Sequence, residues 1–187
     1  KQGEMEVSFW RVRVDDQWTL PAVEFTPAEI RGTTILVADA GRRKVGPEVE
    51  ALLKAGQRVV AVDPFYFGES RIRTHDYLYA LLLAAVGDRP LGLQASQVTS
   101  VARWAHERHA KAPVTLKAVG PRSSLFALIA AALEPEAISG VEATGAMNSL
   151  KEVIENNGSV DKTPELFCFG LLEHFDIPQL KAMVHAQ

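Results

Sequence analysis

The sequence predicts an α/β fold in which a mostly parallel sheet has helices on both faces and an antiparallel hairpin comes first. Short apolar runs rich in β-branched residues recur at 33–38, 58–62 and 114–119, and a segment with helical periodicity follows each of them. Two alternating segments precede these runs. Strands that alternate with helices require right-handed crossovers, so we expect the central strands to run parallel.

The N-terminal segments predict a hairpin. Residues 5–14 and 18–25 alternate between apolar and polar side chains, as half-buried strands do. Asp15 and Asp16 lie between them and are residues that favour turns. A polar loop at 26–32 then leads into the parallel part of the sheet.

The middle of the chain reads as strands and helices in alternation. Residues 33–38 and 58–62 are almost entirely apolar, which is typical of strands covered on both faces. A helix is expected at 47–55, and two more at 77–86 and 94–109.

The segment GDRPLG between the last two of these helices is predicted to be a turn, because Pro90 breaks a local helix.

The C-terminal part predicts a sixth strand and two helices. The strand is expected at 137–144 and the tail helix at 178–185. Between them, a short helix at 149–156 has Ser149 in place as N-cap and Glu152 in place for a capping box.

Composition limits the functions that the chain can have. With 187 residues, 47% of them hydrophobic, it is expected to be one domain, with the hairpin in 1–29 and the parallel core in 30–187. A net charge of −3 gives no reason to expect nucleic-acid or acidic-membrane binding. The single cysteine, Cys168, excludes an intramolecular disulfide and a multi-cysteine metal site.

The sequence lacks the patterns of a membrane span, of common cofactor sites and of a signal peptide. No apolar run reaches the roughly 18 residues of a membrane span. No P-loop, dinucleotide fingerprint or metal-ligand cluster is present, so we expect no cofactor and no metal. The chain starts at Lys1 without a signal-peptide pattern, which suggests a processed or trimmed product and assigns no compartment.

The segment 113–135 is where a nucleophile would be sought. A buried strand at 114–119 is followed by Gly120 and Pro121 and then by a strongly apolar helix at 122–134. This is the sequence pattern of a nucleophile elbow, which lifts one side chain above the C-terminal edge of a parallel sheet.

These segments together resemble the α/β-hydrolases. Residues 63–70, DPFYFGES, resemble the family's D-x-x-G-x-G-x-S, with Tyr66 in place of the first glycine. Residues 39–41 stand where the family has its oxyanion-hole turn, and residues 114–133 resemble the elbow strand and helix. More narrowly, three segments within 30–184 are similar to bacterial acetyl-xylan-esterase-like and glucuronoyl-esterase-like sequences. They are GDRPLGLQASQVTSVARWAHER, GPRSSLFALIAAALEP and PELFCFGLLEHFDIPQLKAMV.

The elbow departs from the family pattern because no serine stands at its tip. Counting from Gly120 places Arg122 at the nucleophile position, and counting back from the helix places Pro121 there. Ser123 and Ser124 follow in the first helical turn, where a serine either caps exposed N–H groups or acts as a displaced nucleophile. If the chain hydrolyses esters, we expect Ser123 to be the nucleophile, with oxyanion N–H groups from the Gly41 turn and the helix start.

In the family, the acid and histidine of the triad follow the last two strands, so the resemblance implies that both lie beyond Gln187 and that these strands are missing. The histidines that are present do not replace them. His106 and His109 are expected on a solvated helix face, and His75 lies in a loop. Asp176 is expected to cap the tail helix rather than to act as the triad acid.

Asp39, Arg42 and Arg122 are the remaining candidate site residues. An acid at the end of a covered strand could form an ion pair with Arg122 across the crevice. Alternatively, Arg42 or Arg122 could bind a carboxylate or a sugar acid, because a guanidinium forms paired hydrogen bonds with such a group.

The sequence therefore leads to two hypotheses about function. The first is a protein related to carboxylic-ester hydrolases whose triad is absent or incomplete. The second is a non-catalytic hydrolase-like domain that binds a carbohydrate or organic acid, or that supports another domain. If the last strands are missing, the strand at 137–144 becomes a sheet edge. We then expect that edge to be covered by the tail helix, by another chain segment, or by a second copy in a homo-oligomer.

Overall fold

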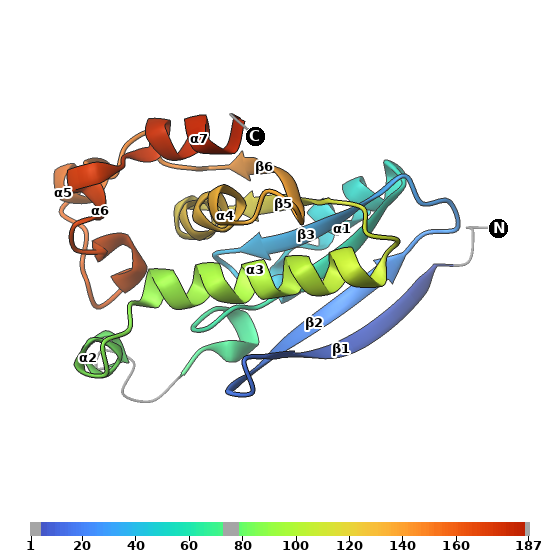
Figure 1. The fold of residues 1–187 in the computed structure, drawn as a ribbon, viewed down its shortest axis with the longest axis horizontal. Coiled ribbons are helices and arrows are strands. Elements are labelled where there is room, and N and C mark those ends of the chain that lie inside the picture. The colour runs from blue at the N-terminus through green and yellow to red at the C-terminus, as the bar shows by residue number, and fades with distance from the viewer. Residues whose placement is uncertain (1–4, 73–78, 186–187) are drawn as a thin grey trace.

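The computed structural model describes residues 5–72 and 79–185, which form a sheet of six strands (Figure 1). The strands are β1 (Glu6–Val14), β2 (Trp18–Thr26), β3 (Gly32–Ala38), β4 (Gln57–Val62), β5 (Val114–Val119) and β6 (Ile138–Thr144). They lie in the order β1-β2-β4-β3-β5-β6. The β1–β2 and β2–β4 pairs are antiparallel, and β4, β3, β5 and β6 run parallel. The predicted fold class and all of its strands are confirmed.

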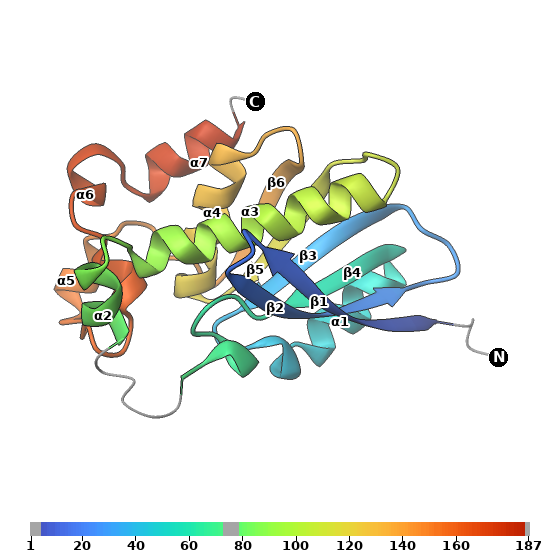
Figure 2. The ribbon, with the colours of Figure 1, turned by 60° about the horizontal axis from the view of Figure 1, so that its bottom comes forward.

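Helices cover both faces of this sheet. They are α1 (Gly46–Lys54), α2 (Tyr79–Ala85), α3 (Pro90–Arg108), α4 (Pro121–Leu133), α5 (Glu152–Glu155), α6 (Leu171–His174) and α7 (Ile177–His185). Figures 1 and 2 show α3 and α4 together on one face and α1 on the other. Among the described helices, none combines the length and the apolar character needed to cross a membrane.

The central strands are buried as their composition predicts. Leu36, Ala38, Val59 and Ala61 pack under α1, whereas Ile35 and its neighbours face the larger cluster beneath α3 and α4. At the hairpin, Asp15 and Asp16 take the left-handed backbone conformation that a tight turn requires, with φ of 49° and 54°. The apolar runs and the hairpin turn thus set the positions of the strands in the sheet.

The start of α3 differs from the prediction. The helix begins at Pro90 rather than at residue 94, so the expected turn ends at Arg89. Pro90 occupies the first helical turn, where its missing N–H would have no partner in any case. The backbone N–H of Leu93 donates to the carbonyl of Arg89 at 3.0 Å, which closes the first turn. The proline therefore starts a helix and does not break one.

Strand β6 forms one edge of the described sheet. It pairs with β5 on one side only, and of its residues only Ile138 is buried. Unpaired N–H and C=O groups on an edge strand can pair with another chain. A homo-oligomer formed through this edge stays a prediction.

A buried ionic cluster joins the end of α3 to the hairpin. Glu24 accepts a hydrogen bond from the indole N–H of Trp10 at 2.7 Å and lies 3.2 Å from both Arg58 Nε and His109 Nε2. The guanidinium of Arg108 covers the Trp10 ring at 4.3 Å. The expectation of a solvated face is wrong for His109, whose side chain is only 12% exposed. Burial, followed by the charge of Arg58, lowers the pKa of His109 from 6.5, and Glu24 opposes this shift only in part.

We expect this histidine to make the fold less stable in mild acid. Below pH 6.5 the unfolded chain protonates His109, whereas the folded chain does so only below the lowered pKa. Between these two pH values the unfolded state binds more protons, so the free energy of unfolding falls as pH falls. Urea unfolding measured between about pH 7.5 and about pH 5.5 should show this loss of stability in the wild type, and His109→Gln should reduce it. The control His185→Gln, at an exposed position, should keep it. Equal pH dependence in wild type and His109→Gln would contradict the expectation.

Candidate functional site

Three turns meet at the edge of the sheet where the parallel strands end. They follow β3, β4 and β5 and comprise residues 39–41, 63–70 and the step from β5 into α4. The crevice outside the carboxyl ends of such strands is where open α/β sheets bind ligands. We therefore take this edge as the candidate site.

Gly120 is the turn residue between the strand and the helix of the predicted elbow, and we refer to it as the tip. It lies between β5 and α4 with φ 108° and ψ 161°, a backbone conformation that essentially only glycine adopts. Pro121 and Arg122 both belong to the first turn of α4, which begins one residue earlier than predicted, and the position that corresponds to the family's nucleophile stays a prediction. The physical reason is that proline fits the first helical position, which lets the helix begin directly after Gly120.

The space above the tip is filled by the carboxylate of Asp39. A Cβ atom on Gly120 would lie 2.8 Å from Asp39 Oδ1 and closer still to Asp39 Cγ. The same carboxylate accepts backbone N–H bonds from Ser123 at 2.7 Å and from Arg122 at 3.2 Å. These donors belong to the positive end of the helix, which favours an anion there. The Asp39 carboxylate thus fills the space next to Gly120 and uses the first N–H groups of α4.

The two serines after the tip are buried beneath it. Ser123 is 0% exposed, and its hydroxyl donates to the Val119 carbonyl at 2.8 Å. Ser124 is equally enclosed, and its hydroxyl donates to the Gly120 carbonyl at 2.6 Å. Both protons are directed back toward the strand and the tip rather than outward. The role of Ser123 as a nucleophile stays a prediction, and this geometry favours a structural role.

The Arg122 side chain forms an ion pair with Glu165 and not with Asp39. The Asp39 carboxylate accepts a hydrogen bond from the backbone N–H of Arg122. Arg122 Nε donates to the Glu165 carboxylate, which is 0% exposed, and the guanidinium covers the Phe67 ring at 4.5 Å. Burial opposes the charge of the guanidinium, but the hydrogen bond and charge of Glu165 outweigh it and raise the pKa of Arg122. Arg122 Nη2 is buried and has no hydrogen-bond partner among the described residues.

Two stacked tyrosines extend this cluster. The rings of Tyr66 and Tyr79 lie 3.5 Å apart, and the Tyr79 hydroxyl donates to Glu165 at 3.4 Å. Burial, and then the Glu165 charge, raises the pKa of the Tyr79 phenol. Tyr66 has φ 68°, the left-handed backbone conformation that glycine adopts most easily, at the position where the resembling motif has a glycine.

The Gly41 turn and the turn after β4 are joined by a second carboxylate. Asp63, which is 1% exposed, accepts backbone N–H bonds from Arg42 at 2.7 Å and from Glu69 at 3.0 Å. The Arg42 side chain contacts Asp63 at 3.2 Å and also pairs with Glu69, so its charge is compensated within the protein. A Cβ on Gly41 would lie 2.6 Å from the Cα of Gly68, which explains the need for glycine at this close approach.

A cavity of about 420 Å³ opens above the elbow. Its wall residues are Asp39, Ala40, Tyr66, Phe67, Gly68, Arg71 and Arg122. Of the residues proposed from the sequence, Asp39 and Arg122 line it, whereas Gly41, Arg42 and Ser123 do not. Two guanidinium groups and aromatic rings in one cavity suit a ligand that carries a carboxylate.

The histidines described by the structure lie outside this cavity. None of His106, His109, His174 and His185 is among its wall residues, and His75 lies outside the described residues. Asp176 accepts N–H bonds from Leu150 at 2.7 Å and from Ile177 at 2.8 Å, the second at the start of α7, so the predicted capping role is confirmed. Within residues 5–72 and 79–185, no cluster of three or more acidic, histidine or cysteine side chains is arranged to bind a metal.

Sequence reasoning missed the start of α4 at Pro121 and the pairing of Arg122 with Glu165. The register was open to two counts because Pro121 was read as part of the turn. Glu165 contacts a residue that lies 43 positions earlier in the chain, and no periodic pattern connects the two. A buried charge in an apolar segment that needs a partner was the available signal.

Comparison with known proteins identifies the fold. No family model matches the chain, and no curated protein matches it. A carboxyl esterase from Bacillus coagulans, in complex with glycerol, matches 91% of this chain and 58% of its own at 16% identity and a TM-score of 0.58. A dienelactone hydrolase from Anabaena variabilis matches 76% of this chain and 63% of its own at 19% identity and a TM-score of 0.53. The fold is that of the α/β-hydrolases.

An esterase from Pyrococcus furiosus gives a TM-score of 0.63 at 15% identity, over 82% of this chain and 54% of the esterase. The chain thus spans between one half and two thirds of the length of these α/β-hydrolases. At such low identity the likeness concerns the fold alone, and the activity has to be argued from the elbow.

We expect the clash between a tip side chain and Asp39 to dominate the effect of substituting Gly120. Gly120→Ala should lower the free energy of unfolding by about 3 kcal/mol, from backbone strain and the lost space together. Gly87→Ala is the matched control, since Gly87 has φ +91° and open space around it, and it should cost about 1 kcal/mol. In an Asp39→Ala background, Gly120→Ala should cost no more than the control does. Equal costs for the two single variants, measured by urea unfolding, would show that Asp39 does not obstruct the tip.

Proposed function

We propose that this chain is a non-catalytic α/β-hydrolase-like domain that binds a small organic acid or sugar acid in the cavity above its elbow. The observation that carries the proposal is the Asp39 carboxylate, which occupies the space above Gly120 and takes the N–H groups of α4. A substrate carbonyl would need that space and those donors. The protein's own anion therefore stands where a bound ester would be attacked.

The residues at the elbow argue against ester hydrolysis at this site. Gly120 provides no nucleophile, and the residue that follows it, Pro121, has no backbone N–H. In this fold, that N–H is one of the donors that stabilise the oxyanion. Position 120 thus lacks a nucleophile, and position 121 lacks the N–H group that would stabilise the oxyanion.

Arg122 supports the binding of an acid. Its Nε donates to Glu165, whereas Nη2 is buried and has no hydrogen-bond partner within residues 5–72 and 79–185; the Arg122 side chain lines the cavity. A buried donor without an acceptor is unfavourable, and a carboxylate would satisfy it with a charge-assisted hydrogen bond. Phe67 and Tyr66 supply flat apolar wall for the body of the ligand.

The narrower resemblance to acetyl-xylan-esterase-like and glucuronoyl-esterase-like sequences belongs to this proposal. It favours uronic acids and acetylated xylo-oligosaccharides as the first ligands to test. A domain of this kind could also support another domain.

Ester hydrolysis with Ser123 as nucleophile is the second candidate function. The strand, turn and helix at the elbow favour it, as does the likeness in fold to esterases.

An assay with short acyl esters separates the two functions. We expect no turnover above background from the wild type, because a triad that acts as a unit supplies about a 10⁶-fold acceleration, most of which is lost without a nucleophile at the tip. Ser123→Ala should give the same rate as the wild type. Ser124→Ala is the control, since it removes a comparable buried hydroxyl from the same helical turn. Turnover that Ser123→Ala abolishes and Ser124→Ala leaves intact would refute the proposal.

Calorimetry tests acid binding directly. Glucuronate and galacturonate should bind to the wild type, whereas the neutral parent sugars should bind at least about tenfold more weakly. Arg122→Lys keeps a positive charge beside Glu165 but loses the planar fork, so it should weaken binding of the acids by about tenfold or more. Arg43→Lys serves as control, because Arg43 pairs with Glu69 at an exposed position outside the cavity wall. No heat with either acid, or equal losses in both variants, would count against the site.

A further inference from the structure

The hairpin strand β1 forms the second edge of the described sheet, opposite β6. It pairs with β2 only, and Figure 1 shows no described element along its outer side. Its nine residues pair with β2 without a register shift, so this edge is long and regular. An edge strand presents a row of N–H and C=O groups that can pair with a further strand.

Strand β1 lacks the features that usually keep edge strands from pairing. It contains no lysine, proline or glycine, and its central residues 7–10 carry no charge. The other edge differs, because β6 has seven residues, a register shift against β5, a glycine at position 140 and an exposed Glu142. Short length, irregular pairing and charged side chains all disfavour pairing at an edge. Of the two edges of the described sheet, β1 is therefore better suited to pair with another chain.

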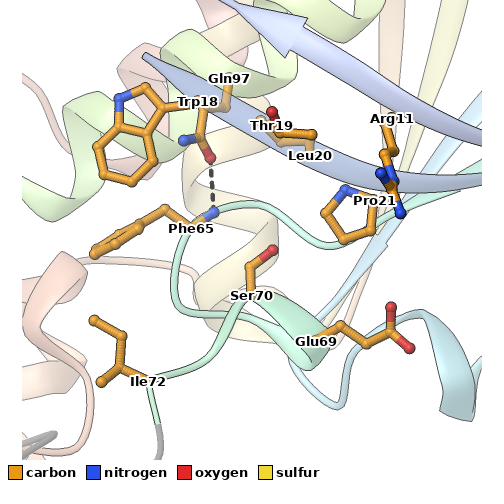
Figure 3. A pocket seen from close by; sticks show the side chains of 10 residues that line it. All are labelled: Arg11, Trp18, Thr19, Leu20, Pro21, Phe65, Glu69, Ser70, Ile72 and Gln97. Atoms are coloured by element: carbon orange, nitrogen blue, oxygen red, sulfur yellow. Dashed lines mark hydrogen bonds between the residues drawn. The ribbon is translucent and has the colours of Figure 1, made fainter.

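One face of β1 exposes apolar side chains beside this edge. Alternate residues of a strand share a face, and on this one Val7 is 40% exposed and Phe9 is 80% exposed. Arg11 continues the same face and lies next to Pro21 of β2 (Figure 3). The opposite face carries Trp10, which packs against an aromatic ring of α3, so the register of the strand cannot slip to bury Phe9. Exposed apolar side chains gathered in this way mark an interaction surface.

The strand is complementary to itself when two copies run antiparallel. Glu6 stands at its start and Arg11 near its other end, and no described residue forms an ion pair with either. Antiparallel pairing brings the acidic end of each strand to the basic end of the other, whereas parallel pairing would align like charges. A register with Ser8 opposite Ser8 of the second copy also places Val7 opposite Phe9, twice. Pairs of an aromatic and a β-branched side chain across two strands stabilise a sheet.

We propose that β1 is a homodimer interface, in which the β1 strands of two copies pair antiparallel about a two-fold axis at Ser8 and join the two sheets into one. Each copy contributes the same residues, as a two-fold interface requires. Two paired edges bury less than the roughly 800 Å² per partner of a standard interface, which makes the dimer weak, with a dissociation constant in the micromolar range. No residue of β1 lines the cavity above the elbow, so the dimer does not depend on acid binding there.

Sedimentation velocity between about 1 and about 100 μM tests the dimer. The wild type should change from monomer to dimer over this range. Phe9→Lys should raise the dissociation constant at least about tenfold, because it removes the contact with Val7 and places a charge at the edge. Phe169→Lys is the matched control, since Phe169 is 87% exposed and lies outside β1, and it should change nothing. Ala143→Lys puts the same charge on an exposed position of β6 and should also change nothing.

A cross-link tests the register. Residues directly opposite in an antiparallel pair have Cβ atoms about 5 Å apart, which a disulfide can bridge. In a Cys168→Ser background, Ser8→Cys should therefore form a disulfide-linked dimer under mild oxidation. Ser139→Cys, at an exposed position of β6, is the control and should form it far more slowly.

Four results would overturn the proposal. They are a monomer at every concentration, equal effects of Phe9→Lys and Phe169→Lys, dissociation of the dimer by Ala143→Lys, and a cross-link at position 139 that forms as fast as the one at position 8.

Discussion

The carboxylate of Asp39 joins the end of β3 to the first turn of α4. Its backbone N–H donates to the Val119 carbonyl at the end of β5 at 2.9 Å, and its side chain accepts the N–H groups of Arg122 and Ser123. A negative group at the positive end of a buried helix is electrostatically favourable. It occupies the crevice that ligands use in open α/β sheets, so the rest of the site is arranged around an internal anion. The absence of a side chain at Gly120 follows from this arrangement, because any Cβ there would overlap the carboxylate.

The end of the neighbouring strand β4 has the same arrangement, in which a buried carboxylate accepts backbone N–H groups. Asp63 at the end of β4 accepts the N–H groups of Arg42 and Glu69, as Asp39 accepts those of the elbow helix. It also fills the space over Gly68, whose φ is +48°. Two carboxylates thus fix all three turns at the carboxyl end of the sheet, each above a glycine with positive φ. These turns supply most of the wall of the cavity above the elbow, so the wall is held by backbone hydrogen bonds to buried carboxylates.

The strands could be predicted from the sequence because their signals are local. An apolar run such as 33–38 determines its own burial, and the alternation at 5–14 determines which side chains face the core. The errors arose where proline was read as an interruption. Pro90 and Pro121 each stand in the first turn of a helix, so both α3 and α4 begin earlier than the sequence predicted. The nearness of Asp39 and Arg122 was foreseen, but the partner of the guanidinium depends on a contact with Glu165 across 43 positions. No local pattern encodes such a contact.

The likeness in fold to esterases below 20% identity shows that very different sequences can form this sheet. The sheet is stabilised by the apolar faces beneath α1, α3 and α4, none of which includes the charged side chains of the crevice. A side chain at the tip would have to adopt a strained backbone conformation, whereas glycine adopts φ 108° without that cost. One donor at the crevice, Arg122 Nη2, has no hydrogen-bond partner among the described residues. Glu165 takes Nε of Arg122 and leaves Nη2 buried without a partner, and a buried cationic donor is stabilised by an acceptor that the described residues do not provide. The Asp39 carboxylate and the Arg122–Glu165 pair thus account for most of the polar groups at the crevice, and Nη2 is the donor that they leave over.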